Sequence, residues 1–243
     1  MTNERVPPQD DLVLSDLFLR AFRLYVDNFS SFVIMAFFSQ GLLFLVMLCY
    51  DFGPLSLRDL AFFFMPFAWI ISLFFGLALT VIIAKRSSGD DIGHSQALSL
   101  AFAKLLPGIG AGAVFTVISC LGLLFFVVPG LYWITVFCFF PFAVILEDKG
   151  VWGSFQRSRD LVQGYRRKVA GAHLAVLLSV CAIVLPFILG MKLLWVPRIY
   201  QSIFTDAVGI LTLPLLTAFY YQLYLYLRNS KETTSRIAVY DVK

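Results

Sequence analysis

The chain has 243 residues and a formal net charge of +4, and 60% of its residues are hydrophobic while only 14% are charged. A soluble domain carries about 25% charged and about 45–50% apolar residues, so this composition excludes an ordinary soluble domain. It also argues against nucleic acid as a partner, because such binding needs a basic patch on an exposed domain and no exposed domain is predicted.

The chain begins with residues 1–11, which are expected to form a disordered cytoplasmic arm because Pro7 and Pro8 prevent a helix there. This polar stretch lacks the apolar core of a signal peptide, so no cleavable signal is expected. Residues 12–228 are predicted to form a single membrane domain, and residues 229–243 a cytoplasmic tail.

Six apolar stretches of this domain reach or approach the roughly 20 residues that a helix needs to cross a bilayer. They cover about 29–50, 60–84, 107–128, 131–146, 169–191 and 207–227. The fourth stretch is short, so we expect it to lie among other helices, and Pro129-Gly130 before it predicts a tight turn. The sequence therefore predicts an all-α, polytopic membrane protein with six transmembrane helices.

Three amphipathic segments, over about 12–27, 87–107 and 148–168, each precede a pair of these stretches. Helices of this kind lie in the plane of the lipid headgroups and do not span the membrane. Residues 10–22 and 90–102 share five identities at a shift of 80 residues, and the third segment has the same character without a clean register. We therefore predict three repeats of an in-plane helix followed by a two-span hairpin, with a chance similarity of helical composition as the alternative.

The placement of Lys and Arg predicts the orientation, because cytoplasmic loops carry an excess of these residues. All but three of the 19 Lys and Arg residues fall before the first span, after the last span, or in the two loops that contain the second and third amphipathic segments. The three exceptions are Arg58, Lys192 and Arg198. Both termini and all three in-plane helices are therefore expected on the cytoplasmic side.

Groups that carry chemistry are scarce. The interiors of the predicted spans contain no Asp, Glu, Lys or Arg, which argues against ion-coupled transport. The four cysteines stand singly, and neither His94 nor His173 belongs to a triad or metal motif, so we expect no metal, no cofactor and no enzymatic activity. Polar residues within the spans, such as Thr80, Thr116 and Gln222, are expected to bond carbonyls of their own helix or of a neighbouring helix.

The third amphipathic segment and the residues that follow it are the most basic part of the chain. We select five candidate contacts for anionic lipid headgroups: Arg157, Arg159, Arg166, Arg167 and Lys168. Each such charge near a membrane surface contributes roughly 1 kcal/mol of attraction. The alternative is that these residues only set the topology. On helical spacing, Val151, Trp152 and Phe155 are expected to share the apolar face.

This part of the chain also carries a recognisable motif, which consists of Pro129-Gly130, Pro141, Glu147, Arg157-Ser158 and Gly164. The motif resembles the central block of the YciC-type bacterial inner-membrane protein family, and it is similar to the membrane domain attached to some glycerophosphodiester phosphodiesterases. The resemblance implies six spans in a bacterial inner membrane. Because no catalytic barrel accompanies the spans, the phosphodiesterase activity is not expected here.

The leading hypothesis is a non-enzymatic membrane module that organises lipids or partner membrane proteins through its cytoplasmic helices. The alternative is a transporter or channel-like facilitator for a small or lipidic substrate. A polar cavity lined by Gln40, Thr80, Thr116 or Gln222 would favour the alternative.

Overall fold

The computed structural model describes residues 14–125 and 127–240, and these residues form ten helices and no strand, which confirms the all-α prediction for this part of the chain. The arm expected over residues 1–11 lies outside the described residues. In chain order the helices are α1 (Leu14–Asp27), α2 (Phe29–Phe52), α3 (Leu55–Ser87), α4 (His94–Ala103), α5 (Leu105–Phe125), α6 (Val127–Phe137), α7 (Phe140–Leu146), α8 (Val151–Val162), α9 (Arg166–Leu193) and α10 (Arg198–Tyr240).

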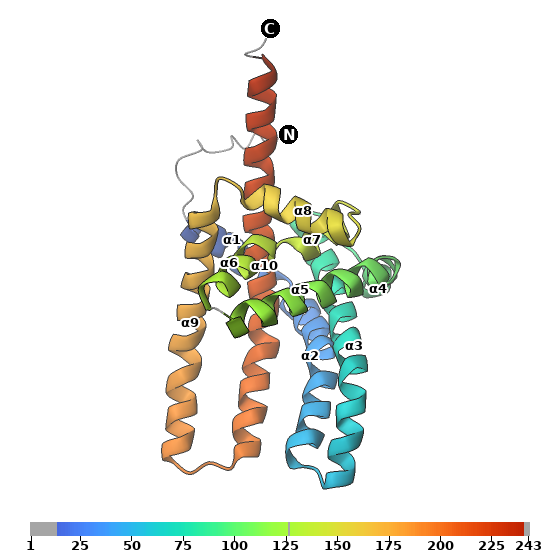
Figure 1. Ribbon diagram of the computed structural model, residues 1–243, viewed down its shortest axis with the longest axis vertical. Helices are drawn as coiled ribbons and strands as arrows, with labels where there is room; N and C mark the ends of the chain where they lie inside the picture. The colour runs from blue at the N-terminus through green and yellow to red at the C-terminus, as the bar shows by residue number, and fades with distance from the viewer. Residues whose placement is uncertain (1–13, 126, 241–243) are drawn as a thin grey trace.

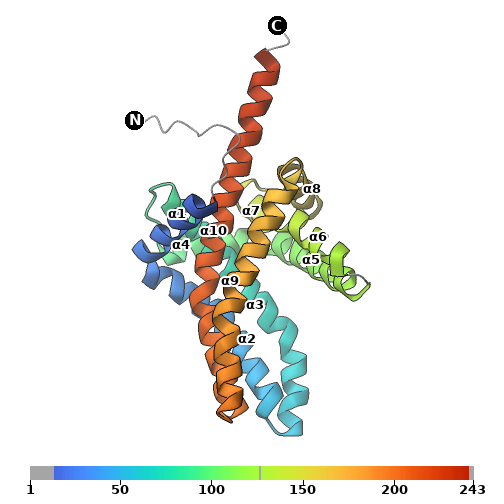
Figure 2. The same ribbon diagram turned by 90° about the vertical axis from the view of Figure 1, so that its left-hand side faces the viewer.

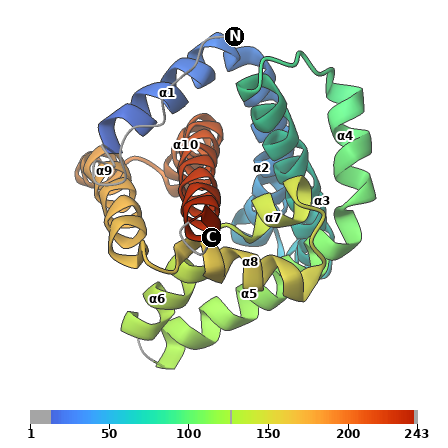
Figure 3. The same cartoon turned by 90° about the horizontal axis from the view of Figure 1, so that it is seen from above.

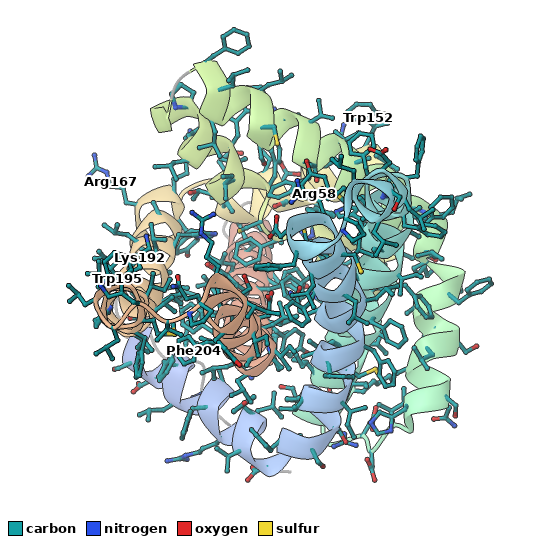
Figure 4. All side chains as sticks on the ribbon, turned by 90° about the horizontal axis from the view of Figure 1, so that it is seen from below. Arg58, Trp152, Arg167, Lys192, Trp195 and Phe204 are labelled. Carbon is teal, nitrogen blue, oxygen red and sulfur yellow. The ribbon has the colours of Figure 1, made fainter. Side chains whose placement is uncertain are left out.

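Six stretches are long and apolar enough to cross a membrane, as predicted. They are α2, α3, α5, Pro129–Leu146, α9 and the part Arg198–Thr233 of α10. The α2–α3 and α9–α10 pairs form two upright hairpins whose turns lie at the same end of the molecule, called here the turn end (Figure 1). Arg58 and Lys192 lie near these two turns (Figure 4).

The helices α1, α4 and α8 lie crosswise to the upright hairpins at the opposite end, called here the α8 end (Figures 1 and 3). Seen along the long axis, they lie on different sides of α10. The buried face of α1 carries Leu17, Ala21 and Tyr25 at helical spacing, and α4 buries Ala97 and Ala101 in the same way. The apolar residues that recur at helical spacing in these segments therefore form the face that packs on the long upright helices.

The buried core lies at the α8 end. There the run from Leu77 to Ala84 in α3 packs with Phe32 of α2, Phe139, and Leu223 and Tyr224 of α10, and the largest of these side chains are completely buried. Toward the turn end, Phe62 and Phe63 of α3 and Trp195 after α9 are exposed. This distribution is typical of a helical protein whose outer surface is in contact with acyl chains, because apolar side chains there gain nothing from burial against protein.

Helix α10 is longer than the sequence indicated, because it continues through most of the expected tail to Tyr240. Two features explain the extension: residues 229–240 contain no Gly or Pro, and Arg228 pairs with Glu232 one turn later, at 2.9 Å between Nε and Oε1. The continuation projects past the crosswise helices (Figures 1 and 2).

The α5–α6 hairpin differs from the two upright hairpins, because it runs obliquely across the molecule and its tip stays well short of the turn end (Figures 1 and 2). The prediction of a tight turn at Pro129-Gly130 is wrong, since both residues lie within the first turn of α6. Pro129 is tolerated there because the first N–H groups of a helix have no intrahelical partner. Gly130 is required by close packing: a Cβ atom at this position would lie 2.7 Å from the backbone nitrogen of Leu123 in α5.

Replacing Gly130 with Ala is expected to force α5 and α6 apart and to lower the free energy of unfolding by about 1–3 kcal/mol, because the obstructing atoms belong to the backbone and cannot rotate away. Thermal unfolding of the detergent-solubilised chain measures the change. Gly190→Ala in α9 is the matched control, since nothing lies within 4 Å of its added Cβ. Equal melting temperatures for the two variants would contradict the close approach.

Candidate functional site

A buried polar cluster joins α7, α8 and α10. Glu147 follows the last residue of α7, and its side chain is only 13% exposed. Arg157 of α8 places its Nε 2.7 Å from one carboxylate oxygen of Glu147, and the Tyr224 hydroxyl of α10 donates to the other oxygen at 2.5 Å. One carboxylate therefore ties the consecutive helices α7 and α8 to α10, which is distant in the sequence.

Ser158, next to Arg157 on the same helix, is completely buried and repairs the break between α6 and α7. Pro141 cannot donate a backbone hydrogen bond and its ring obstructs the carbonyl four residues earlier, so the helix is interrupted before it. The Ser158 hydroxyl donates to the Val136 carbonyl at 2.7 Å and accepts a hydrogen bond from the Phe139 amide at 3.2 Å. One side chain thus satisfies a donor and an acceptor that the break leaves free.

Gly164 and Asp148 allow α8 to lie across the ends of its neighbours. Gly164 has a φ of +92° between α8 and α9, a backbone conformation that favours glycine. Asp148, after Glu147, has a φ of +53°, which Asp tolerates better than most residues. Its carboxylate also pairs with Lys104, which lies between α4 and α5. The motif residues from Pro141 to Gly164 therefore build one joint around α8.

The five candidate lipid contacts differ in their surroundings. Arg159, Arg166 and Arg167 are exposed, and Figure 4 shows Arg167 pointing away from the protein. Arg157 is 27% exposed and already paired with Glu147. The Lys168 ammonium lies 5.8 Å from the centre of a neighbouring tyrosine ring. The structure thus gathers three exposed guanidinium groups near the junction of α8 and α9.

Large apolar side chains also project outward from the three crosswise helices. Trp152 of α8 is 71% exposed, so the expectation that it shares the apolar face with Phe155 is wrong. It lies about 60° further round the helix than Phe155, which is buried. Phe102 on α4 and Phe22 on α1 are also exposed. An exposed aromatic next to basic residues is typical of helices that rest at a membrane interface.

The sequence did not indicate the partners that complete these contacts. Tyr224 contacts Glu147 across 77 positions, and nothing local marks it among the tyrosines of α10. Arg86 at the end of α3 donates to the side-chain oxygen of Asn28, between α1 and α2, at 2.5 Å. A polar residue at a span boundary, such as Asn28, is the only signal that the sequence offers for such a joint.

The chemistry that this arrangement supports is anion binding and structural pairing. Among residues 14–125 and 127–240, no three His, Cys, Asp or Glu side chains are close enough to hold a metal ion. Both carboxylate oxygens of Glu147 are engaged, so this group holds helices together. The guanidinium groups of Arg159, Arg166 and Arg167 are exposed and can meet a phosphate, which guanidinium recognises by paired hydrogen bonds, although that of Arg166 also lies 5.7 Å from the centre of the Tyr132 ring.

Residues 55–223 match the model of a protein family that is described as a domain of unknown function (DUF7847). No curated protein matches the chain. No solved structure matches it either.

Replacing Glu147 with Gln is expected to lower the free energy of unfolding by about 3 kcal/mol, because Arg157 is left partly buried without its counter-charge. Arg157→Gln has a similar effect, and the double variant loses less than the sum of the two, since the residues act as a pair. Thermal unfolding in detergent measures each change. Asp90→Asn, which breaks an exposed ion pair with Lys85, is the control and should cost less than about 1 kcal/mol. Additive losses would show that Glu147 and Arg157 are not coupled.

Replacing Ser158 with Ala should cost about 1–3 kcal/mol of stability, because the Val136 carbonyl and the Phe139 amide lose their buried partner. Ser179→Ala is the control: its exposed hydroxyl only adds a second hydrogen bond to a helical carbonyl, so the melting temperature should scarcely change. If Ser158→Ala melts like Ser179→Ala, the break between α6 and α7 does not depend on the hydroxyl.

Proposed function

We propose that this protein, which belongs to the DUF7847 family because the match covers more than half of the chain, is a non-enzymatic membrane module that binds anionic lipid headgroups. Its binding surface consists of Arg159, Arg166 and Arg167, at the junction of α8 and α9. The single observation that carries the proposal is the exposure of these three guanidinium groups on crosswise helix α8 and at the start of α9.

The crosswise helices α1, α4 and α8 lie, in this proposal, in the headgroup plane of one leaflet. The support is the two-sided character of each helix, with small or apolar residues packed inward and Phe22, Phe102 and Trp152 directed outward. Long aromatic side chains at that depth bury an apolar ring while the polar backbone stays near water.

A repeated unit of crosswise helix and hairpin is supported by matching burial. Residues separated by 80 positions share their environments: Leu17 and Ala97 are buried, Ala21 and Ala101 are completely buried, and Phe22 and Phe102 are both exposed. Helix α8 has a similar pattern: the small residues Ser154 and Ser158 lie one turn apart, and both are completely buried. Common spacing in three helices favours a repeat over chance composition.

The proposed orientation places the α8 end and both chain termini in the cytoplasm. The turn end carries Arg58, Lys192 and Arg198, while the other basic residues that the structure describes belong to elements of the α8 end, and such an excess is typical of cytoplasmic loops. The resemblance of the Pro129–Gly164 motif to the YciC-type family supports a bacterial inner membrane as the location.

Transport is the weaker proposal, because three of the four polar side chains expected to line a path, those of Thr80, Thr116 and Gln222, already have partners. The Thr80 and Thr116 hydroxyls donate to carbonyls of their own helices, as predicted, at 3.0 and 2.9 Å. The Gln222 amide lies 3.3 Å from the Ser87 hydroxyl. Groups engaged in this way support packing between helices.

The lipid proposal is tested with the full chain purified in mild detergent and reconstituted with equal parts of an anionic and a zwitterionic phospholipid. The variant Arg159→Gln/Arg166→Gln/Arg167→Gln is expected to bind the anionic lipid up to about a hundredfold more weakly, because each charge contributes roughly 1 kcal/mol. Native mass spectrometry measures the retained lipid.

The matched control is Arg58→Gln/Lys192→Gln/Arg198→Gln, which removes the same charge from the turn end. These residues are divided between two hairpins, so little specific retention should be lost. Equal losses for the two triple variants would show that only net charge matters, and unchanged retention in the first would leave topology as the role of its arginines.

A further inference from the structure

We infer that the α5–α6 hairpin inserts into only one leaflet, from the α8 end, and that its outer surface binds the acyl chains of that leaflet. The chain would then cross the membrane four times, through α2, α3, α9 and α10, rather than six times. The inference concerns the insertion depth of this hairpin, and it shares only Arg166 with the headgroup surface, where the residue serves as a marker of depth.

The first observation is the contact between α6 and the start of α9. The Arg166 guanidinium lies 5.7 Å from the centre of the Tyr132 ring, in a cation–π arrangement. Arg166 is the first residue of α9, and its charge confines it to the interface at the α8 end, because a charged side chain in the hydrocarbon is costly. Tyr132 is therefore held near the same interface.

The length of α6 then limits how deep the hairpin can reach. Tyr132 lies five residues after Val127, where α6 begins, so the tip extends at most about 8 Å beyond Tyr132 at 1.5 Å per residue. Adding the 5.7 Å between Tyr132 and the Arg166 guanidinium places the tip at most about 13 Å from that charged group. The hydrocarbon core of a bilayer is about 30 Å thick. The tip therefore cannot reach the far interface, whereas the 28 residues of α9 extend over about 42 Å.

The packing of α5 gives the same result. Its beginning crosses α3 closely, since a Cβ atom on Gly108 would lie 2.7 Å from a Leu77 methyl group, and one on Gly110 would lie 2.8 Å from Val151 at the start of α8. Helix α8 is itself crosswise, so α5 runs beneath it and not along the upright hairpins (Figure 3).

The exposed surface of the hairpin identifies its partner. Leu124 and Phe125, near the tip, are 78% and 68% exposed, and α5 contains no charged residue. A surface of this kind marks a contact with a membrane or with another protein. Because the tip stays within the half of the bilayer on the α8 side, the acyl chains of that leaflet are the partner that fits it.

Intramolecular cross-linking tests the insertion depth directly. The four native cysteines are replaced by alanine in the full chain, and two cysteine pairs are introduced: Tyr132→Cys with Arg166→Cys, and Tyr132→Cys with Lys192→Cys at the turn end (Figure 4). A short bismaleimide added to native membranes should convert most of the first pair, and only a background fraction of the second, into the cross-linked peptide seen by mass spectrometry. The reverse result would establish six crossings and overturn the inference.

A second measurement leaves Tyr132 and Arg166 unchanged, so its result does not depend on how their replacement affects the local structure. Single cysteines at Leu124, Asp90 and Trp195 are treated in sealed vesicles with a membrane-impermeant thiol reagent, after labelling in detergent has shown that each thiol can react. Asp90→Cys and Trp195→Cys should be labelled from opposite sides, because they lie at the α8 end and the turn end (Figure 4). Protection of Leu124→Cys from the Trp195 side supports the inference, and labelling from that side overturns it.

Discussion

The need to satisfy every backbone polar group in a membrane governs this structure at the break between α6 and α7. Pro141 interrupts the helix, and a break of this kind is stable in hydrocarbon only when another group supplies the lost hydrogen bonds. Here the Ser158 hydroxyl supplies two hydrogen bonds, one to the Val136 carbonyl and one from the Phe139 amide. Because Ser158 lies on α8, the repair fixes that helix across the break and brings Arg157 against Glu147. The position of the crosswise helix α8 therefore follows from the interruption between α6 and α7.

The same joint explains why the buried core lies at one end of the molecule. Glu147 binds Tyr224 of α10 as well as Arg157 of α8, so the carboxylate links the crosswise layer to the longest helix. Around it, α3 and α10 exclude water and lipid, while their opposite halves carry exposed phenylalanines and leucines. Charge pairs stabilise the α8 end, whereas the turn end exposes apolar side chains.

Most predictions that depend on local spacing agree with the structure, and the face assigned to Trp152 is the exception. The i−4 hydrogen bonds of Thr80 and Thr116, and the inward faces of α1 and α4, follow from the geometry of a single helix. Predictions that depend on how two segments meet were less successful. Pro129-Gly130 was interpreted as a turn because those residue types terminate helices, whereas here Pro129 starts a helix and Gly130 admits the backbone of α5.

The sequence by itself determined that the described chain is helical, that six stretches have the length and apolarity of membrane spans, and where amphipathic helices interrupt them. These properties depend on composition and on periods of a few residues. Only the tertiary structure decided that the α5–α6 hairpin is oblique and that Glu147 binds Tyr224. Such features depend on contacts between residues distant in the chain, such as Tyr132 with Arg166 and Glu147 with Tyr224. The composition of an apolar helix is the same whether the helix stands upright or lies across its neighbours.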